Sequence, residues 1–414
     1  MVHPRSSESS TPGGSRIEMT TTNSIDSKKL KNLPSSYAKV GWALLIVGLA
    51  LTVLSLMMDP KHASFGLIMT LTYVAGIGIG GLFWVGVEYV SSAVWSTAMR
   101  RPFEFISGVI PFLIILALPL LFMMHSVFEW THLSYFKDDP AMIVKAPYLN
   151  IPFFVVRTVL VLGIWALFYF LITGNSRKQD VTKDQLLTRK NVRLSAGFMP
   201  LFAITLTIFS IDWLMSLTPS WFSTIFAVYV FAGSVLAAMA MGTLIIVLLN
   251  EKDKFPVKLT PDHYYNLGAF LFAFTVFWAY IGFSQFMLQW YGNLREETLY
   301  YIPRMHGSWA AISIALALAQ FLIPFFLLVT KPAKMDPRRL VFVSIWLLAA
   351  HALDIYWMVM PVYNPTGAVF GIAEIAFVVL SLGVILTAFA GKAKGENMIP
   401  IGDPKLQRGI EFHL

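Results

Sequence analysis

Ten long apolar runs dominate this sequence, and each is long enough to cross a bilayer hydrocarbon core of roughly 30 Å. Because lipid offers no partner for backbone N–H and C=O groups, such runs are expected to be helices, which bond these groups internally. The predicted spans cover residues 41–58, 65–97, 103–124, 152–173, 194–217, 221–249, 264–290, 307–330, 338–360 and 368–390. The sequence therefore predicts an all-α integral membrane protein of about ten transmembrane helices.

The composition agrees with a chain that lies in lipid. Hydrophobic residues make up 57% of the 414 residues and charged residues 13%, far from the balance of a soluble domain. A formal net charge of +8 would suggest nucleic-acid binding in a soluble protein. Here most lysines and arginines lie in short loops between apolar runs, where they determine topology, so no nucleic acid is expected.

The distribution of the basic residues predicts the orientation of the spans. If the N-terminus is cytoplasmic, 25 of the 31 lysines and arginines lie on the cytoplasmic side. The six on the other side are Lys61, Lys137, Lys145, Arg157, Arg295 and Arg304. Since loops rich in Lys and Arg stay in the cytoplasm, both termini are predicted to be cytoplasmic.

Two polar tails flank a membrane domain that we expect at residues 37–395. Residues 1–36 are rich in Ser, Thr, Gly and Lys without apolar periodicity, so they are predicted to be a disordered or partner-bound cytoplasmic tail. They lack the apolar core and cleavage site of a signal peptide. Residues 396–414 are expected to form a second cytoplasmic tail.

The middle eight spans carry a faint internal repeat. Span five ends in FSIDWLMSLTP and span nine in HALDIYWMVMP, so Asp212 and Asp354 each precede a proline by seven residues. The repeat predicts two four-helix bundles, at about 65–217 and about 221–360. An even number of crossings separates them, so they are expected to be parallel, with one further helix at each end. Chance similarity between apolar segments is the alternative.

Ionisable side chains within the spans are candidate functional residues, because a charge near the bilayer centre costs on the order of 2.5–3.5 kcal/mol. They are Glu88 in span two, Glu104 at the cytoplasmic entrance of span three, Asp212 in span five, His351 and Asp354 in span nine, and Glu374 in span ten. Residues three apart share a helix face, so His351 and Asp354 are expected to exchange a hydrogen bond or a proton. The successive depths predict a proton relay from Glu104 and Glu88 to the two aspartates and the histidine. The alternative for each residue is structural, such as a bond to a neighbouring helix or an anchored turn.

A second concentration of polar residues is expected at the outer mouth. His125, Glu129 and His132 follow span three, and Arg157 begins span four. One helical turn separates His125 from Glu129, so this pair is suited to binding a quinol head group, to accepting its proton or to docking a partner. In the second repeat, Gln285 and Gln289 take the corresponding positions, and they hydrogen-bond without titrating. The two bundles are therefore not expected to be chemically equivalent.

The sequence contains no cysteine, which excludes disulfides, thiolate-ligated iron–sulfur clusters and covalently attached c-type haem on this chain. No metal site is predicted, and b-type haem is not expected because His351 is the only histidine well inside a span. The glycines within residues 76–81 are expected to permit close helix packing rather than to bind phosphate. Any redox centre that needs sulfur must lie on a partner.

Four motifs, HSVFEW, KAPYLNIPFFVVR, FSIDWLMSLTP and HALDIYWMVMP, occur in this order within the predicted tandem bundles. In this respect roughly residues 37–395 resemble the NrfD/polysulfide-reductase family of membrane subunits. Within that family they are most similar to the ActF-type subunits of alternative complex III, a bacterial quinol:electron-acceptor oxidoreductase.

This resemblance implies a multi-pass protein of the bacterial inner membrane with three kinds of partner. They are a sister NrfD-type membrane subunit, an iron–sulfur and molybdopterin-fold subunit, and multihaem c-type cytochromes. The resemblance assigns the haems and iron–sulfur clusters to these partners and leaves a quinone as the one cofactor to consider for this chain. It also implies that the better-supported quinol site lies in the sister subunit.

Three functions fit the sequence. The leading hypothesis is a membrane subunit of a quinol-oxidising electron-transport complex that holds no redox centre and contributes a proton path and a degenerate quinone pocket. The alternatives are a secondary transporter with buried carboxylates and a purely structural membrane anchor. Transporter repeats typically bind substrate at the midplane through broken helices, whereas Pro219 and Pro361 stand at the ends of their spans.

Overall fold

The computed structural model describes residues 25–31, 33–132 and 140–414, and within these ranges the chain is helical and has no strand. Ten of the described segments are long and apolar enough to cross a membrane. They are α1 (Ser35–Met58), α2 (Pro60–Ser91), η1–α3–η2–α4 (Thr97–Met99, Arg100–Ile106, Ser107–Phe112, Leu113–Phe122), α7 (Ile151–Thr182), α8–η5 (Leu186–Trp213, Met215–Leu217), α9 (Phe226–Glu251), α10 (Pro261–Gly292), α12–η7–α13 (Gly307–Ala317, Leu318–Leu322, Ile323–Leu328), α15 (Pro337–Tyr363) and α16 (Ile372–Ala393). The predicted all-α membrane fold is confirmed.

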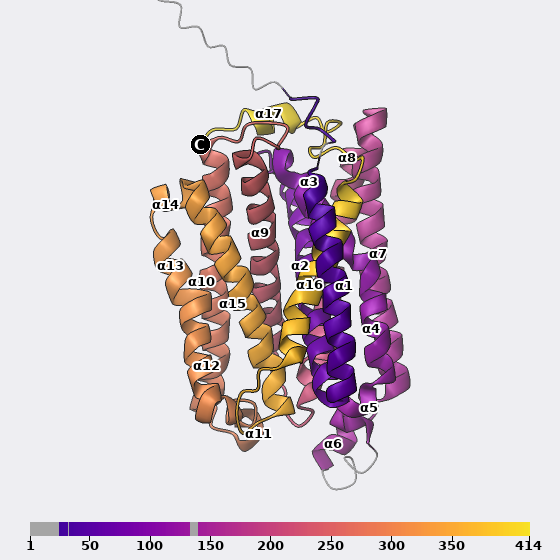
Figure 1. The fold of residues 1–414 in the computed structure, drawn as a ribbon, viewed down its shortest axis with the longest axis vertical. Coiled ribbons are helices and arrows are strands. Elements are labelled where there is room, and N and C mark those ends of the chain that lie inside the picture. The colour runs from indigo at the N-terminus through magenta and orange to yellow at the C-terminus, as the bar shows by residue number, and fades with distance from the viewer. Residues whose placement is uncertain (1–24, 32, 133–139) are drawn as a thin grey trace, which may run out of the picture.

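Short helices lie in the connections between these segments. They are α5 (Met124–Val127), η3 (Glu129–Thr131), α6 (Pro140–Lys145), α11 (Arg295–Thr298), η6 (Pro303–Met305), α14 (Lys331–Met335) and α17 (Leu406–Ile410). The C-terminus and α17 lie at one end of the molecule, and α6 and α11 lie at the other (Figure 1). We call these the α17 end and the α6 end.

Two four-helix bundles stand side by side (Figure 1). The first is a ring of α2, α4, α7 and α8, and the second a ring of α9, α10, α12–α13 and α15. Helices α2 and α9 meet between the bundles and are the two most enclosed spans. The first and last spans, α1 and α16, pack along each other, and α16 also contacts α2. This is the arrangement of tandem bundles and flanking helices that the repeat predicts.

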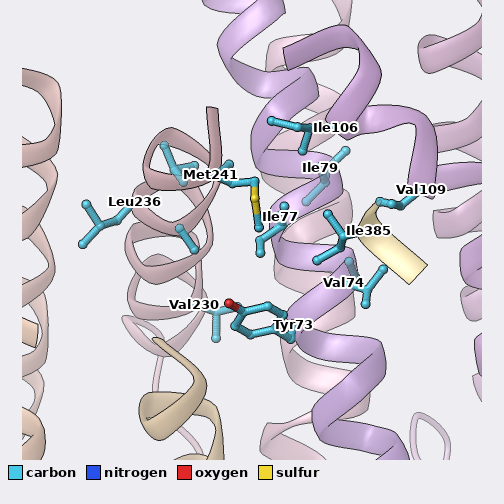
Figure 2. Packing of buried hydrophobic residues seen from close by; sticks show 14 of the residues in the cluster. Tyr73, Val74, Ile77, Ile79, Ile106, Val109, Val230, Leu236, Met241 and Ile385 are labelled. Atoms are coloured by element: carbon cyan, nitrogen blue, oxygen red, sulfur yellow. The ribbon is translucent and has the colours of Figure 1, made fainter. Parts of the chain in front are cut away.

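Aliphatic and aromatic side chains fill the space between α2 and its neighbours (Figure 2). Ile77 and Ile79 of α2 are wholly buried there, and the buried Met241 of α9 points toward α2. Close approach of the two helices depends on glycine, because a Cβ at Gly80 would lie 2.7 Å from the Cβ of Ala238. The structure thus agrees with a packing role for the glycine run.

Several helix boundaries differ from the sequence-based prediction. Span two was expected to reach residue 97, but α2 ends at Ser91 because Ser92 takes a left-handed φ of 54° and its N–H caps the carbonyl of Glu88. Residues 92–96 then form a turn before η1. Conversely, α7 continues past Gly174 to Thr182 because no proline interrupts its polar end, and Lys183, with a φ of 56°, stops it.

Two spans are irregular where proline removes a backbone donor. Pro111 lies in the 3₁₀ segment η2 within span three. In span eight, Pro324 has no N–H to offer the carbonyl four residues earlier, and the preceding turn is the π-helix η7. Neither irregularity was predicted.

The predicted tails are partly packed against the membrane domain. Most of the predicted N-terminal tail, residues 1–24 and 32, lies outside the described residues, as does Lys137. Residues 25–31 contact the chain: the N–H of Asp26 bonds to the carbonyl of Pro256, and the N–H of Met398 bonds to the carbonyl of Leu30. In the C-terminal segment, α17 packs against η1 and buries Leu406 and Ile410. The C-terminal segment is therefore part of the folded α17 end.

Candidate functional site

Buried charges gather at the α17 end, where the loop after α2 leads into α3. Arg100 bonds to three carboxylates: Nη1 lies 2.8 Å from Glu88, Nε 3.2 Å from Glu104 and Nη2 2.8 Å from Asp403. Its guanidinium also lies 4.6 Å from the ring centroid of Tyr89. All three carboxylates are at least nine-tenths buried. Glu88 and Glu104, which were predicted to be neighbours in a relay, thus share one arginine.

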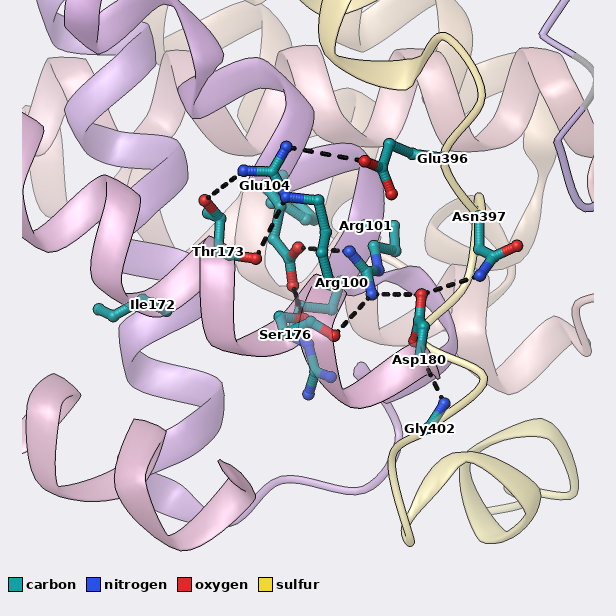
Figure 3. Close-up of polar contacts among 12 residues, drawn as sticks. Arg100, Arg101, Glu104, Ile172, Thr173, Ser176, Asp180, Glu396, Asn397 and Gly402 are labelled. Carbon is teal, nitrogen blue, oxygen red and sulfur yellow. Dashed lines mark hydrogen bonds and ion pairs between the residues drawn. The ribbon is translucent and has the colours of Figure 1, made fainter. Parts of the chain in front are cut away.

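Arg101 holds a second branch of this cluster (Figure 3). Its Nη1 lies 3.1 Å from Glu104 and its Nη2 2.6 Å from Asp180 of α7. Ser176 of α7 donates to Glu104 over 2.7 Å. Asp180 also accepts from the Asn397 side chain and from the backbone N–H of Gly402, so the C-terminal segment closes the cluster.

Four members of this cluster were not predicted from the sequence. Arg100 and Arg101 were counted only as topology signals, and Asp180 and Asp403 lie in segments that were assigned to loops and a tail. A usable signal was present, because Arg100 and Glu104 are four residues apart on one helix. The contacts with Asp180 and Asp403 join residues distant in sequence, and no local pattern encodes them.

The cluster has more acidic than basic groups. Glu88, Glu104, Asp180 and Asp403 supply four carboxyl groups, whereas Arg100 and Arg101 supply two guanidinium groups. A cavity of about 60 Å³ borders Glu88 and Arg100, which is room for a few water molecules. A buried site with surplus carboxyl groups and access to water is suited to taking up and releasing a proton.

Toward the α6 end, the first bundle contains a closed ion pair. Nε and Nη2 of Arg157 on α7 donate to the two carboxylate oxygens of Asp212 on α8 over 2.8 and 2.9 Å. The Arg157 guanidinium also lies 3.8 Å from the ring centroid of Tyr148. Burial raises the pKa of the Tyr148 hydroxyl, and the Asp212 carboxylate raises it further. Arg157 was expected at an open mouth, but it is 6% exposed and bonded to Asp212.

The matching carboxylate of the second bundle, Asp354, forms no ion pair with an arginine of the described residues. It is 1% exposed and accepts hydrogen bonds from the Tyr229 hydroxyl and, over 3.1 Å, from Trp278 Nε1. Nδ1 of His351 lies 3.7 Å from Asp354 Oδ2, which agrees with the predicted shared face. Both ring nitrogens of His351 lack a hydrogen-bond partner although the side chain is buried. Gly233 of α9 leaves room for the pair, since a Cβ there would lie 3.1 Å from the imidazole.

An apolar layer separates the two levels of ionisable groups. The ring centroids of His351 and Tyr73 on α2 lie 5.5 Å apart, and Glu88 follows Tyr73 by fifteen residues, or about 22 Å along the axis. The α2 residues between include Ile77, Ile79 and other wholly buried aliphatic side chains (Figure 2). The structure therefore brings Glu88 together with Glu104, and His351 together with Asp354, but it does not bring the two groups together.

The predicted outer-mouth residues are in different environments, because Arg157 is buried in its ion pair with Asp212. His125, Glu129 and His132 are exposed at the α6 end. The expectation that His125 and Glu129 lie one turn apart on a helix is wrong, because α5 ends at Val127 and Phe128 is extended, with φ −102° and ψ 109°. His132 bonds to the carbonyl of His125, and their ring centroids lie 5.5 Å apart.

The repeat counterparts of these residues are in a different environment. Gln285 and Gln289 lie within the continuous helix α10 and are buried. Gln289 accepts a hydrogen bond from the indole of Trp221 over 3.3 Å. The two bundles therefore differ in backbone as well as in side chains at this position.

In the part of the chain that the structure describes, no group of three His, Asp or Glu side chains is placed to hold a metal ion. No protein-family model matches this sequence, and no curated protein is significantly similar to it.

Proposed function

We propose that this chain is a membrane subunit of a quinol-oxidising electron-transport complex and that its buried carboxyl groups carry protons for that complex. The proposal rests on the resemblance of the four motifs to the NrfD/polysulfide-reductase family and on the placement of ionisable groups in the fold. In this assignment the haems and iron–sulfur clusters belong to partner subunits, since the chain has no cysteine.

The observation that carries the proton-path assignment is the environment of Asp354. Both donors to its carboxyl group, Tyr229 and Trp278, are neutral. Among the described residues no arginine or lysine pairs with this carboxyl group, in contrast to Asp212 with Arg157, and we assign Asp354 as a proton carrier on this ground. His351, whose Nδ1 lies 3.7 Å from Asp354 Oδ2 and whose two ring nitrogens lack hydrogen-bond partners, is a suitable second proton carrier.

The proposed path exchanges protons at two points, which are the His351–Asp354 pair and the cluster around Arg100. In this cluster the carboxyl groups outnumber the guanidinium groups among the described residues, and Glu88 borders the small cavity at the α17 end. The two exchange points are not joined by hydrogen bonds among the described residues, so water has to bridge the apolar layer during turnover. We assign Asp212 a structural role beside this path, because both of its carboxylate oxygens accept hydrogen bonds from Arg157.

The transporter alternative receives less support. Secondary transporters place their ionisable and substrate-binding groups near the midplane at broken helices. Here the helix α15 that carries His351 and Asp354 is continuous from Pro337 to Tyr363, and the π-helix η7 contains no charged residue. A purely structural anchor would not require a buried histidine without hydrogen-bond partners.

The proposal includes an orientation with the α17 end in the cytoplasm of a bacterium. It is supported by the excess of Lys and Arg in the segments at that end. A phosphatase or fluorescent reporter fused after Leu414 should report the cytoplasm, and one inserted in the exposed turn after Tyr291 should report the outer side. The opposite pattern at both sites would contradict this orientation and would reverse which side of the membrane each end of the proposed proton path faces.

The test of the proposed function is purification of the full-length chain from its own membrane in a mild detergent. We expect stoichiometric haem-containing partners, an iron–sulfur subunit and oxidation of a quinol coupled to reduction of an acceptor. Dissociation of the assembly should leave this chain without a haem absorption band. A chain that purifies alone and catalyses solute exchange in liposomes would overturn the proposal in favour of a transporter.

A further inference from the structure

A cavity of about 770 Å³ lies between α10 and α12 in the second bundle. This volume is within the range of roughly 300–1,000 Å³ that is typical of pockets for small ligands. Three of its polar lining residues, Gln285, Tyr301 and Arg304, lie toward the α6 end, whereas Val276 stands nine residues before Gln285, about 13 Å deeper along α10. Most of the remaining wall is apolar, including Ala279, Leu316, Ala317 and Phe321. The cavity therefore fits a molecule with a polar head and a long apolar part.

Arg304 supplies a positive charge at the polar end without a carboxylate partner. It is 2% exposed, and no carboxylate oxygen of the described residues lies within 4.0 Å of it. Three of its five N–H groups donate to backbone carbonyls, those of Tyr300, Trp357 and Met358, which leaves two. Burial lowers the pKa of this guanidinium from its ordinary value, so an anionic oxygen beside it would be strongly favoured.

Gln285 adds an unpaired acceptor to the same cavity. The side chain is 3% exposed, and its Oε1 has no hydrogen-bond partner. A buried acceptor of this kind gains from a ligand that donates a hydrogen bond. A head group with both a phosphate and a hydroxyl satisfies the two requirements. A zwitterionic head group would bring an ammonium group close to Arg304, which like-charge repulsion disfavours.

The surface around the cavity is suited to contact with lipid. Tyr280 and Phe283 of α10 are 65% and 64% exposed, and Ile314 of α12 is 63% exposed. Uncharged aromatic and aliphatic side chains of this kind face acyl chains and the membrane interface. The bilayer itself is therefore the source of the amphipathic molecule.

We propose that this cavity binds one anionic phospholipid of the phosphatidylglycerol class. Its phosphate accepts from Arg304, a head-group hydroxyl donates to Gln285, and an acyl chain lies along the apolar wall between α10 and α12. Tyr229 and Trp278, the two donors to Asp354, also line this cavity, so the lipid lies beside that part of the proposed proton path. The assignment does not rest on the redox partners, because it concerns the chain's own contact with the membrane.

Lipid titration of delipidated protein, followed by native mass spectrometry, tests this proposal. The full-length chain, in the assembly with which it purifies, would be titrated with dioleoylphosphatidylglycerol. Ala279→Phe fills the cavity, and Gln285→Glu places a carboxylate in it that repels the phosphate. Ala315→Phe is the matched control, since Ala315 is an exposed residue of α12 outside the cavity wall.

The wild-type chain and Ala315→Phe should bind one phosphatidylglycerol with equal affinity. Both cavity variants should bind phosphatidylglycerol at least about tenfold more weakly than the wild type does. The wild-type chain should bind phosphatidylcholine more weakly than phosphatidylglycerol by a similar factor. If Ala279→Phe fails to fold, Gln285→Glu still gives the result. Equal phosphatidylglycerol binding by the foldable variants, equal affinity for phosphatidylcholine, or a quinone in the cavity in place of a phospholipid would overturn the proposal.

Discussion

Asp212 and Asp354 occupy matching places in the sequence repeat, but their neighbours give them different properties. Arg157 binds both oxygens of Asp212, whereas Asp354 receives bonds from a phenol and an indole. The sequence predicted both aspartates and the approach of His351 to Asp354, because helical spacing is a local property. It did not predict which aspartate has the arginine, because that depends on how α7 packs against α8.

Replacing Arg157 alone should destabilise the protein strongly. Arg157→Gln leaves the Asp212 carboxylate buried without its cation, and breaking a buried pair from one side costs about 3–5 kcal/mol. The double variant Arg157→Gln/Asp212→Asn removes both charges and should be less destabilised than the single variant. Unfolding midpoints in one detergent measure this, and a double variant that is less stable than Arg157→Gln would contradict the ion-pair account.

Asp59, in the short link between α1 and α2, should make stability depend on pH. Its carboxylate accepts from the backbone N–H of His62 and from the Tyr363 hydroxyl, and these bonds lower its pKa below the ordinary value of 3.8. A lowered folded-state pKa stabilises the protein above the unfolded value, and the contribution disappears as the pH falls through the folded value.

The Asp59→Asn variant should therefore differ most from the wild type above pH 3.8. The difference in free energy of unfolding should narrow as the solution is made more acidic. Unfolding midpoints measured from about pH 2 to pH 6 give the comparison. A difference that stays constant over this range would show that Asp59 does not contribute through its charge.

At the scale of elements, the pairing of α1 with α16 depends on small residues at the contact. A Cβ at Gly48 would lie 2.6 Å from the Cα of Leu380, closer than packed atoms approach, whereas a Cβ at Gly163 of α7 would meet nothing within 4 Å. Gly48→Ala should therefore destabilise the protein by about 1–3 kcal/mol through overpacking. Gly163→Ala should stabilise it by about 0.5–1 kcal/mol because alanine is the better helix former.

Unfolding of the two glycine variants in the same detergent measures this difference in sign. Equal effects of Gly48→Ala and Gly163→Ala would contradict the close packing of α1 on α16.

The number and approximate position of the spans followed from apolar length, which is a property of each segment alone. The end of α2 at Ser92 and the π-helix before Pro324 depend on single backbone conformations, so the hydropathy pattern did not predict them.

At the scale of the whole molecule, the buried charged side chains of the described residues lie at two levels, with an apolar layer along α2 between them. The sequence predicted the depth of these groups, because depth follows from position along a span. It did not predict that the C-terminal segment closes the cluster at the α17 end through Asp403, a contact between residues about 300 positions apart along the chain. Proton transfer therefore has to be tested between two separate groups of ionisable side chains rather than along a continuous relay.

The most direct measurement is proton-coupled quinol oxidation by the assembled complex in liposomes, with Asp354→Asn in this chain. The variant should assemble, because an asparagine oxygen still accepts from Trp278 and its amide can donate to the Tyr229 oxygen. We expect proton-coupled activity to be lost, and Asp354→Glu, which keeps a titratable group, to restore part of it. Full activity and full proton coupling in the assembled Asp354→Asn complex would contradict the assignment of Asp354 as a proton carrier.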